Sequence, residues 1–212
     1  MSTPETRYFS RFLAKARIPF SGRVLDLGCG NGRLARVIAR SSDVKQVEAI
    51  DLNPDDEWAT PSEGLQFSVG DAEQLPYATA SFDTVLALNV LHHVENPSRA
   101  IDEILRVCRA NGTIAIVEPN RWNPLGYVHL TLMGNHQHFT TSKFIQLLRS
   151  HLDLTELRRF ECHCYPLPAA ALGILECAED LLDRVPLWKP FLFYNVAISK
   201  NVYFSGSRRD DS

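Results

Sequence analysis

Residues 24–33 have the sequence VLDLGCGNGR, and this stretch decides the fold of the chain. Apolar residues surround one aspartate, glycine then recurs at every second position, and a helix-like run begins at Leu34. A short apolar run that enters a glycine turn is typical of a buried strand ending in a tight loop. Because glycine lacks a Cβ, the loop backbone can adopt positive φ and approach a ligand closely. The following helix points unpaired N–H groups and its positive dipole end at the same place.

The spacing of the glycines narrows the kind of ligand. The dinucleotide fingerprint G-x-G-x-x-G ends in a small residue, but this chain has Arg33 at the sixth position. An acidic residue, Asp51, follows Gly32 by 19 residues, at the end of a predicted strand over 47–50. A carboxylate there can accept two hydrogen bonds from a ribose diol, each contributing about 1.5–3 kcal/mol. We therefore predict a nucleoside site that departs from the dinucleotide pattern.

Composition excludes several other classes of protein. The chain has 212 residues, which fits one domain, and its net charge of −3 with no long basic run argues against a nucleic-acid binder. The five cysteines are an odd number without metal-finger spacing, so we expect reduced thiols, a cytoplasmic protein and no metal site. We see no signal-peptide core and no apolar run long enough to span a bilayer, so we expect no integral membrane segment.

Strands and helices alternate along the rest of the first 120 residues. We predict a first helix over 3–16 and further strands over 65–69, 84–88 and 113–119. Asn96 and Pro97 are typical of a helix start, and Asn111-Gly112 of its end. This alternation predicts an α/β fold with a parallel sheet covered by helices on both faces. Two later strands are predicted over 152–164 and 191–202.

At this point the chain resembles a known family. The four blocks that carry the resemblance, in order, are VLDLGCGNG, AIDLNP, GDAEQLPYATASFDTVLALNVLHHVENP and EILRVCRANGTIAIVEPN. Together they are similar to the class I S-adenosylmethionine (SAM) methyltransferases, nearest to the branch of ubiquinone and menaquinone biosynthesis methyltransferases. The likeness covers residues 22–120. It implies SAM as cofactor and a Rossmann-like, seven-stranded, mostly parallel sheet with an antiparallel last strand.

The resemblance also implies cofactor contacts. The residues at matching positions are Asp26, Gly28, Cys29, Gly30, Asp51, Leu52, Asp71, Ala72, Asn89, Val90 and His93. The glycine loop and Asp26 would bound the methionine end, and Asp51 would bind the ribose hydroxyls. Asp71, with the backbone of the next residue, would contact the adenine amino edge. Asn89 would hold the methionyl ammonium through its backbone carbonyl, because ligands lie beyond the carboxyl ends of strands in such sheets.

The second half of the chain should set the choice of acceptor. Tyr127, His136 and His138 are our candidate catalytic residues, and the sequence does not rank them. A neutral imidazole can take a proton from a hydroxyl or an activated carbon. Ordinary structural histidines remain an alternative, and two histidines without further ligands are a weak metal motif. For the His92-His93 pair, the resemblance favours a loop that lines the cofactor cleft over a catalytic pair.

An apolar helix is expected near residues 172–185. Leucines and other apolar residues fall on one face and acidic residues on the other, which predicts core packing or a lid over an apolar substrate. Because the helix is acidic, binding to anionic membranes is disfavoured. We expect one methyltransferase domain over 1–204, with core motifs over 22–120 and substrate-side elements over 120–190, and a polar tail over 205–212.

The leading functional hypothesis is methyl transfer from SAM to a small acceptor at O, C or N, with apolar or lipid-like acceptors included. Two other classes stay open. A non-catalytic SAM-binding regulator would keep the fold without turnover. A nicotinamide-dependent oxidoreductase shares the strand, glycine loop and acidic residue, but Arg33 and the Asp71 block count against it. The sequence predicts neither the methylated atom nor the oligomeric state.

Overall fold

The structure is a computed structural model, and it describes residues 4–124, 126–127, 139–164 and 169–202. Its strands are β1 Gly22–Leu27, β2 Val44–Asp51, β3 Leu65–Val69, β4 Phe82–Leu88, β5 Cys108–Pro119, β6 Leu154–Phe160 and β7 Tyr194–Lys200. Its helices are α1 Pro4–Ala16, α2 Arg33–Ile38, α3 Pro97–Val107, α5 Thr141–Arg149 and α6 Ala169–Leu182, with short 3₁₀ helices η1 Asp56–Ala59 and η2 Pro186–Phe191.

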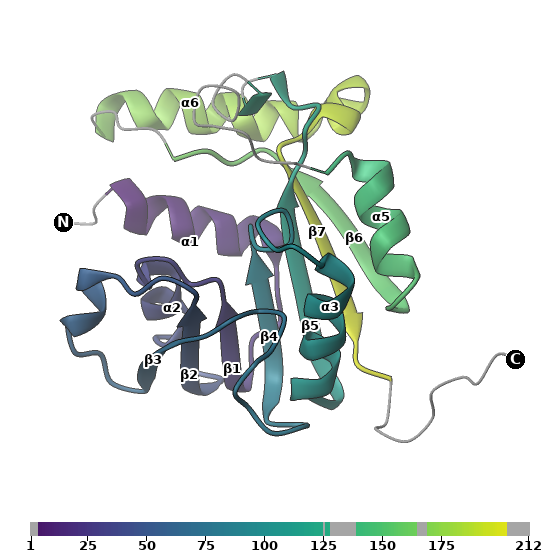
Figure 1. Ribbon diagram of the computed structural model, residues 1–212. Coiled ribbons are helices and arrows are strands. Elements are labelled where there is room, and N and C mark those ends of the chain that lie inside the picture. Colours follow the sequence, from purple (N-terminus) through teal and green to yellow (C-terminus); the bar gives the residue numbers. More distant parts are fainter. Residues whose placement is uncertain (1–3, 125, 128–138, 165–168, 203–212) are drawn as a thin grey trace, which may run out of the picture.

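The strands form one sheet in the order β3-β2-β1-β4-β5-β7-β6 (Figure 1). The five strands from β3 to β5 pair in parallel, whereas β7 is antiparallel to both β5 and β6. This arrangement confirms the predicted Rossmann-like fold with its antiparallel last strand. The order reverses between β1 and β4, which is where open α/β sheets bind their ligands.

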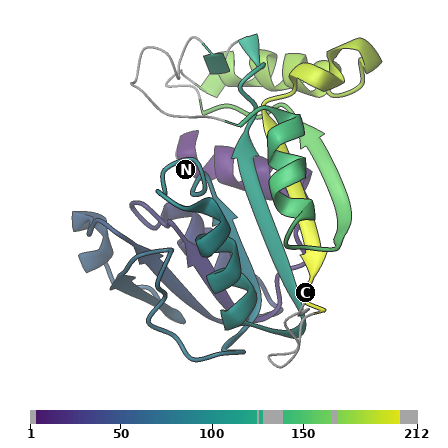
Figure 2. The same cartoon turned by 45° about the vertical axis from the view of Figure 1, so that its right-hand side comes forward.

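Helices cover both faces of the sheet, as predicted. Figure 2 shows α3 and α5 in front of the sheet and α1 behind it. Alternation along β1 explains the two cores, because Leu25 and Leu27 pack against α3 while Val24 packs against α1 and α2. Both faces of the central strands are therefore buried, which is why these strands are apolar almost throughout.

Three predicted boundaries were wrong. Helix α3 ends at Val107 rather than near Asn111, since β5 already pairs with β4 at Cys108; Asn111, with φ of 61°, lies inside the strand. Strand β6 ends at Phe160, because the next segment leaves the sheet for contacts with α6. Strand β7 begins at Tyr194, after the proline-containing 3₁₀ helix η2.

Helix α6 packs its acidic residues against α1, so its predicted apolar face is buried only in part. The acidic residues form ion pairs with α1, among them Arg7 with Glu176, Arg11 with Glu179 and Lys15 with Asp180. Of the predicted apolar side, Leu172 is buried, whereas Leu181 is 64% exposed. Figure 1 shows α6 lying above α1. The described residues include no helix that is both long and apolar enough to cross a membrane.

Arg11→Met should lower the free energy of unfolding by about 1 kcal/mol, because partly exposed ion pairs contribute little individually. Arg11 contacts both Glu179 and Asp180, so its loss leaves the buried Glu179 with fewer partners. Urea unfolding at low and high salt measures the effect, and the difference should shrink in high salt. Arg40→Met, at an exposed arginine, is the matched control. A larger loss in high salt would contradict the electrostatic account of the α1–α6 contact.

Candidate functional site

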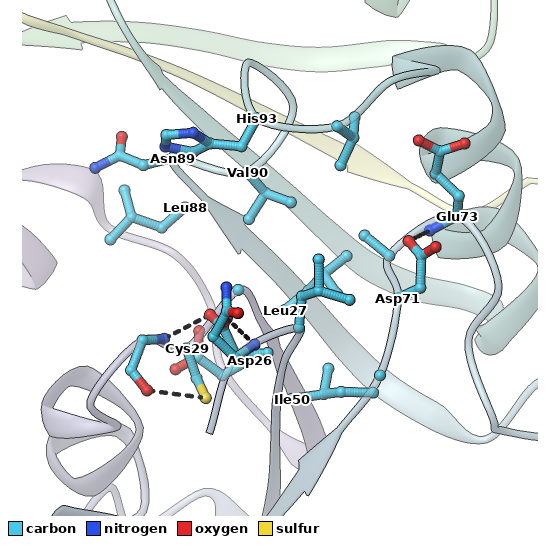
Figure 3. A pocket seen from close by; sticks show the side chains of 18 of the residues that line it. Asp26, Leu27, Cys29, Ile50, Asp71, Glu73, Leu88, Asn89, Val90 and His93 are labelled. Atoms are coloured by element: carbon cyan, nitrogen blue, oxygen red, sulfur yellow. Dashed lines mark hydrogen bonds between the residues drawn. The ribbon is translucent and has the colours of Figure 1, made fainter. Parts of the chain in front are cut away.

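A cleft of about 1180 Å³ opens at the carboxyl ends of β1, β2 and β4 (Figure 3). All eleven residues expected to contact the cofactor line it, although they come from four separate stretches of the chain. Tyr8 and Phe9 of α1 form part of its wall as well. The sequence motifs therefore converge on one concave surface large enough for a nucleoside and a small acceptor.

The glycine loop between β1 and α2 forms the floor of this cleft. Gly28, Gly30 and Gly32 have φ of 72°, 51° and 76°, a conformation that L side chains rarely adopt. A Cβ at Gly28 would lie 2.4 Å from Cγ2 of Val90, whereas a Cβ at Gly30 would meet no atom within 4 Å. The loop is thus tightly packed behind Gly28 and open at Gly30. Such a loop lets a ligand lie directly against the backbone.

Asp51 fastens the loop to the end of β2. Its Oδ2 accepts the N–H of Gly30 at 2.9 Å, and its Oδ1 accepts the N–H of Asn53 at 3.0 Å. An ionised carboxylate offers about four acceptor positions, so these two bonds leave capacity for the two hydroxyls of a ribose. Trp58 also donates its indole N–H to the Gly30 carbonyl at 2.7 Å. Sequence reasoning missed Trp58, which no motif marks.

Asp26 lies beneath the loop and is only 2% exposed. Within the described residues its Oδ2 has no hydrogen-bond partner. Burial, with a contribution from the charge of Asp51, raises the pKa of Asp26 to about 7. A buried carboxylate is costly unless a cation or a donor pairs with it. The cleft therefore favours a positively charged ligand group next to Asp26. The ammonium at the amino-acid end of SAM is such a group.

Ligand affinity should depend on pH through Asp26. Below about pH 7 the carboxylate takes up a proton and loses its attraction for a cation, so affinity for S-adenosylhomocysteine (SAH) should fall by up to tenfold per pH unit. Above about pH 7 affinity should be level. Calorimetric titrations between pH 5.5 and 8.0 measure this dependence. Asp26→Asn, which cannot ionise, should bind more weakly and show no such slope; an equal slope in both proteins would contradict the assignment.

The far end of the cleft carries the side chains expected near adenine. Asp71 follows β3, and its Oδ1 accepts the N–H of Glu73 at 2.9 Å, which holds the turn in shape. Ala72 is buried beside it, while Leu52 is an exposed apolar side chain on the cleft wall. This combination of one polar edge and two apolar surfaces suits a purine base.

The tip of β4 forms the other end of the cleft. Asn89 has φ of 58°, and its Oδ1 is buried without a partner among the described residues. It lies against Tyr194, whose pKa burial raises to about 12, and Tyr194 shares a 2.7 Å hydrogen bond with the hydroxyl of Tyr8. Sequence reasoning missed Tyr194, which no motif marks. Asn89 thus lines the cleft in a left-handed conformation that asparagine tolerates.

Of the three predicted catalytic residues, Tyr127 is the one that lies in the described part of the chain. Tyr127 lies after β5, is 52% exposed and is not part of the cleft lining. His136 and His138 lie outside the described residues. Asn123 anchors this region by donating to the buried Glu161, a contact that sequence reasoning missed because it joins positions 38 residues apart. The described part of the chain contains no group of three or more potential metal ligands.

Comparison with known proteins agrees with this site. Residues 25–116 match the model of a family described as a methyltransferase domain. Over these residues the chain is therefore similar to a methyltransferase domain. The matched residues run from β1 into β5 and so include the glycine loop, Asp51, Asp71 and Asn89.

Two curated relatives show how far the sequence likeness extends. A 27-O-demethylrifamycin SV methyltransferase of Amycolatopsis mediterranei is 36% identical over 120 residues, which are 52% of this chain and 43% of the relative. A phthiotriol/phenolphthiotriol dimycocerosates methyltransferase of Mycobacterium leprae is 29% identical, covering 64% of this chain and 49% of the relative. The chain thus spans about half the length of the curated relatives it matches.

The likeness in fold covers nearly the whole chain. A Haloferax volcanii methyltransferase, solved in complex with the methyltransferase activator Trm112, superposes with a TM-score of 0.68. That comparison covers 94% of this chain and 92% of the other, at 19% sequence identity. At this identity it bears on the fold alone, and it agrees with the arrangement of helices and strands from α1 to β7.

Proposed function

We propose that this protein binds SAM in the cleft and transfers its methyl group to a small acceptor. The observation that carries the proposal is the buried carboxylate of Asp26, whose Oδ2 has no hydrogen-bond partner among the described residues, in a cleft that also holds Asp51, Asp71 and the glycine loop. The family match supports the same cofactor. Residues 1–204 would act as a single domain, with the acceptor approached from the 120–190 side.

Each residue has a binding task in this mechanism. Asp51 accepts hydrogen bonds from the ribose, and Asp71 with the Ala72 backbone contacts the adenine edge. Asp26 and the carbonyl of Asn89 bound the cationic amino-acid end. The bound cofactor supplies a methyl group on a positively charged sulfur, which is already activated for transfer.

The remaining task of the protein is to align the acceptor and exclude water. Tyr8 and Phe9 of α1 face the cleft together with Leu88 and Val90 of the β4 tip, so these side chains would enclose the acceptor. Holding two reactants in line supplies effective molarities of roughly 10⁵–10⁸ M. Apolar walls favour an apolar acceptor, and the name of the dimycocerosates methyltransferase relative is consistent with a lipid-like one.

Methyl-tritiated SAM, incubated with the purified protein and fractionated small molecules, tests the proposed reaction. We expect label in at least one organic fraction, identified by mass spectrometry as a gain of one methyl group, and production of SAH. Asp51→Ala, tested at the same SAM concentration, should incorporate far less label. Binding of SAM without incorporation from quinone-like, lipid or polar fractions would favour the non-catalytic regulator instead.

A further inference from the structure

A buried carboxylate and imidazole lie directly behind the loop at the tip of β4. Glu118, at the end of β5, is fully buried; its Oε1 accepts the N–H groups of Val90 at 3.0 Å and Leu91 at 2.7 Å. Its Oε2 lies 2.5 Å from Nδ1 of His92, whose side chain is 4% exposed. One carboxylate thus holds three successive residues of the loop. A buried carboxylate of this kind fixes which imidazole nitrogen carries the proton.

His93 extends this arrangement into the cleft. Its ring lies against that of His92, with centroids 4.0 Å apart and planes tilted by 41°, and its backbone N–H donates to the carbonyl of Val90 at 2.9 Å. Of the four histidines in the described ranges, at positions 92, 93, 151 and 163, His93 is the one that lines the cleft. Figure 3 shows its ring beside Asn89, across the cleft from Asp26. Asn89 and Asp26 both belong to the end of the cleft at which we place the amino-acid part of SAM.

We propose that His93 is the general base for the acceptor, and that Glu118 and His92 are positioning residues that hold its ring. The inference rests on the proposed function and narrows it to acceptors that carry a hydrogen on the methylated atom, such as a phenol or an amine. The acceptor atom forms its bond to the methyl carbon, the sulfur keeps the electron pair of the broken S–C bond, and a ring nitrogen of His93 takes the proton. The products are SAH, the methylated acceptor and an imidazolium.

The proposed base role depends on how firmly the ring of His93 is oriented. A general base must lie within hydrogen-bond reach of the proton it removes, and a positioned base contributes about 10²–10⁴-fold to the rate. The loop that bears His93 is fixed from behind by the three contacts to Glu118, and His92 supports the ring from one side. The resemblance assigns His93 to cofactor contacts alone. A general base and a cofactor contact predict different effects of a His93 substitution on kcat and on SAH affinity.

Kinetics of His93→Gln with an acceptor from the labelling screen separates these roles. We expect kcat to fall about 100-fold while the Kd for SAH stays within twofold. His151→Gln, on a histidine near the end of α5 and away from the cleft, should leave both values unchanged. Unaltered kcat in His93→Gln, or its loss in His136→Gln or His138→Gln instead, would overturn the proposal. A loss of SAH affinity as large as the loss of rate would indicate that His93 is a cofactor contact and not the general base.

Glu118→Gln tests the positioning role. Glutamine keeps an oxygen for the Val90 and Leu91 amides but turns an NH₂ group towards His92, so the proton of His92 should move from Nδ1 to Nε2. We expect kcat to fall between about tenfold and 100-fold through misplacement of His93, with little change in SAH affinity. A wild-type kcat in a folded Glu118→Gln variant would contradict the positioning role.

Nitrogen-15 spectra of the histidines give a readout that needs no acceptor. In the SAH complex at pH 7.5, His93 should be neutral with one unprotonated ring nitrogen, and His92 should carry its proton on Nδ1. A His93 imidazolium at that pH would overturn the proposal, since it cannot accept a proton. Failure of the wild-type protein to bind SAH would instead refute the proposed function itself, so the two failures are distinguishable.

Discussion

Asp51→Ala is expected to weaken SAH binding about 150-fold, which corresponds to about 3 kcal/mol. Two effects contribute. The carboxylate would bind the ribose hydroxyls directly, and it also ties the Gly30 N–H and the Asn53 N–H into the shape of the cleft. Removing it leaves the ligand without its charged acceptor and the glycine loop without one of its anchors. Isothermal titration calorimetry measures the change.

Two controls make this result specific. Asp56→Ala removes an exposed aspartate five residues further on and should leave affinity unchanged. Asp51→Asn keeps the size of the side chain and one oxygen, so we expect an intermediate loss. Circular dichroism should show all three variants folded. Wild-type affinity in a folded Asp51→Ala would mean that the ribose site has been misplaced.

Gly28→Ala should lower the free energy of unfolding by about 3 kcal/mol. An alanine there is held at φ of 72°, which costs about 1–2 kcal/mol. Its Cβ would also lie 2.4 Å from Cγ2 of the buried Val90, and overpacking of this kind costs a further 1–3 kcal/mol. Urea unfolding monitored by fluorescence measures the loss.

Gly30→Ala is the matched control for this prediction. It has the same left-handed strain, at φ of 51°, but its Cβ would meet no atom within 4 Å, so only about 1–2 kcal/mol should be lost. The double variant Gly28→Ala with Val90→Ala should recover the part due to collision, relative to Val90→Ala alone. Equal losses in the two glycine variants would contradict the tight packing of the loop against the β4 tip.

The parallel half of the fold followed from local sequence because its signals are local. The glycine loop, Asp51 and the cap at Asn96 each depend on a few neighbouring residues, and the structure has each where it was expected. Ligand-facing residues could be predicted together because parallel strands end at the same edge of the sheet. All eleven expected cofactor residues accordingly line one cleft.

Features that depend on distant partners were beyond prediction. The acidic side of α6 looks like a solvent face until α1 supplies Arg7, Arg11 and Lys15 against it. Glu118 lies near the end of an apolar strand, and no neighbouring residue indicates its role. The role follows from its hydrogen bonds to loop residues 26–28 positions earlier in the chain. The sequence marked Tyr127, His136 and His138 as catalytic candidates; of these, Tyr127 lies in the described part of the chain and outside the cleft lining, and the roles of all three stay predictions.

Calorimetric titration of the wild-type protein with SAH, with NADH as the control, tests the central claim most directly. The account predicts saturable binding of one SAH per chain at pH 7.5, binding about 150-fold weaker in Asp51→Ala, and no heat of binding with NADH. Binding of NADH in place of SAH would favour a nicotinamide-dependent oxidoreductase. Absence of SAH binding by the folded protein would contradict the account.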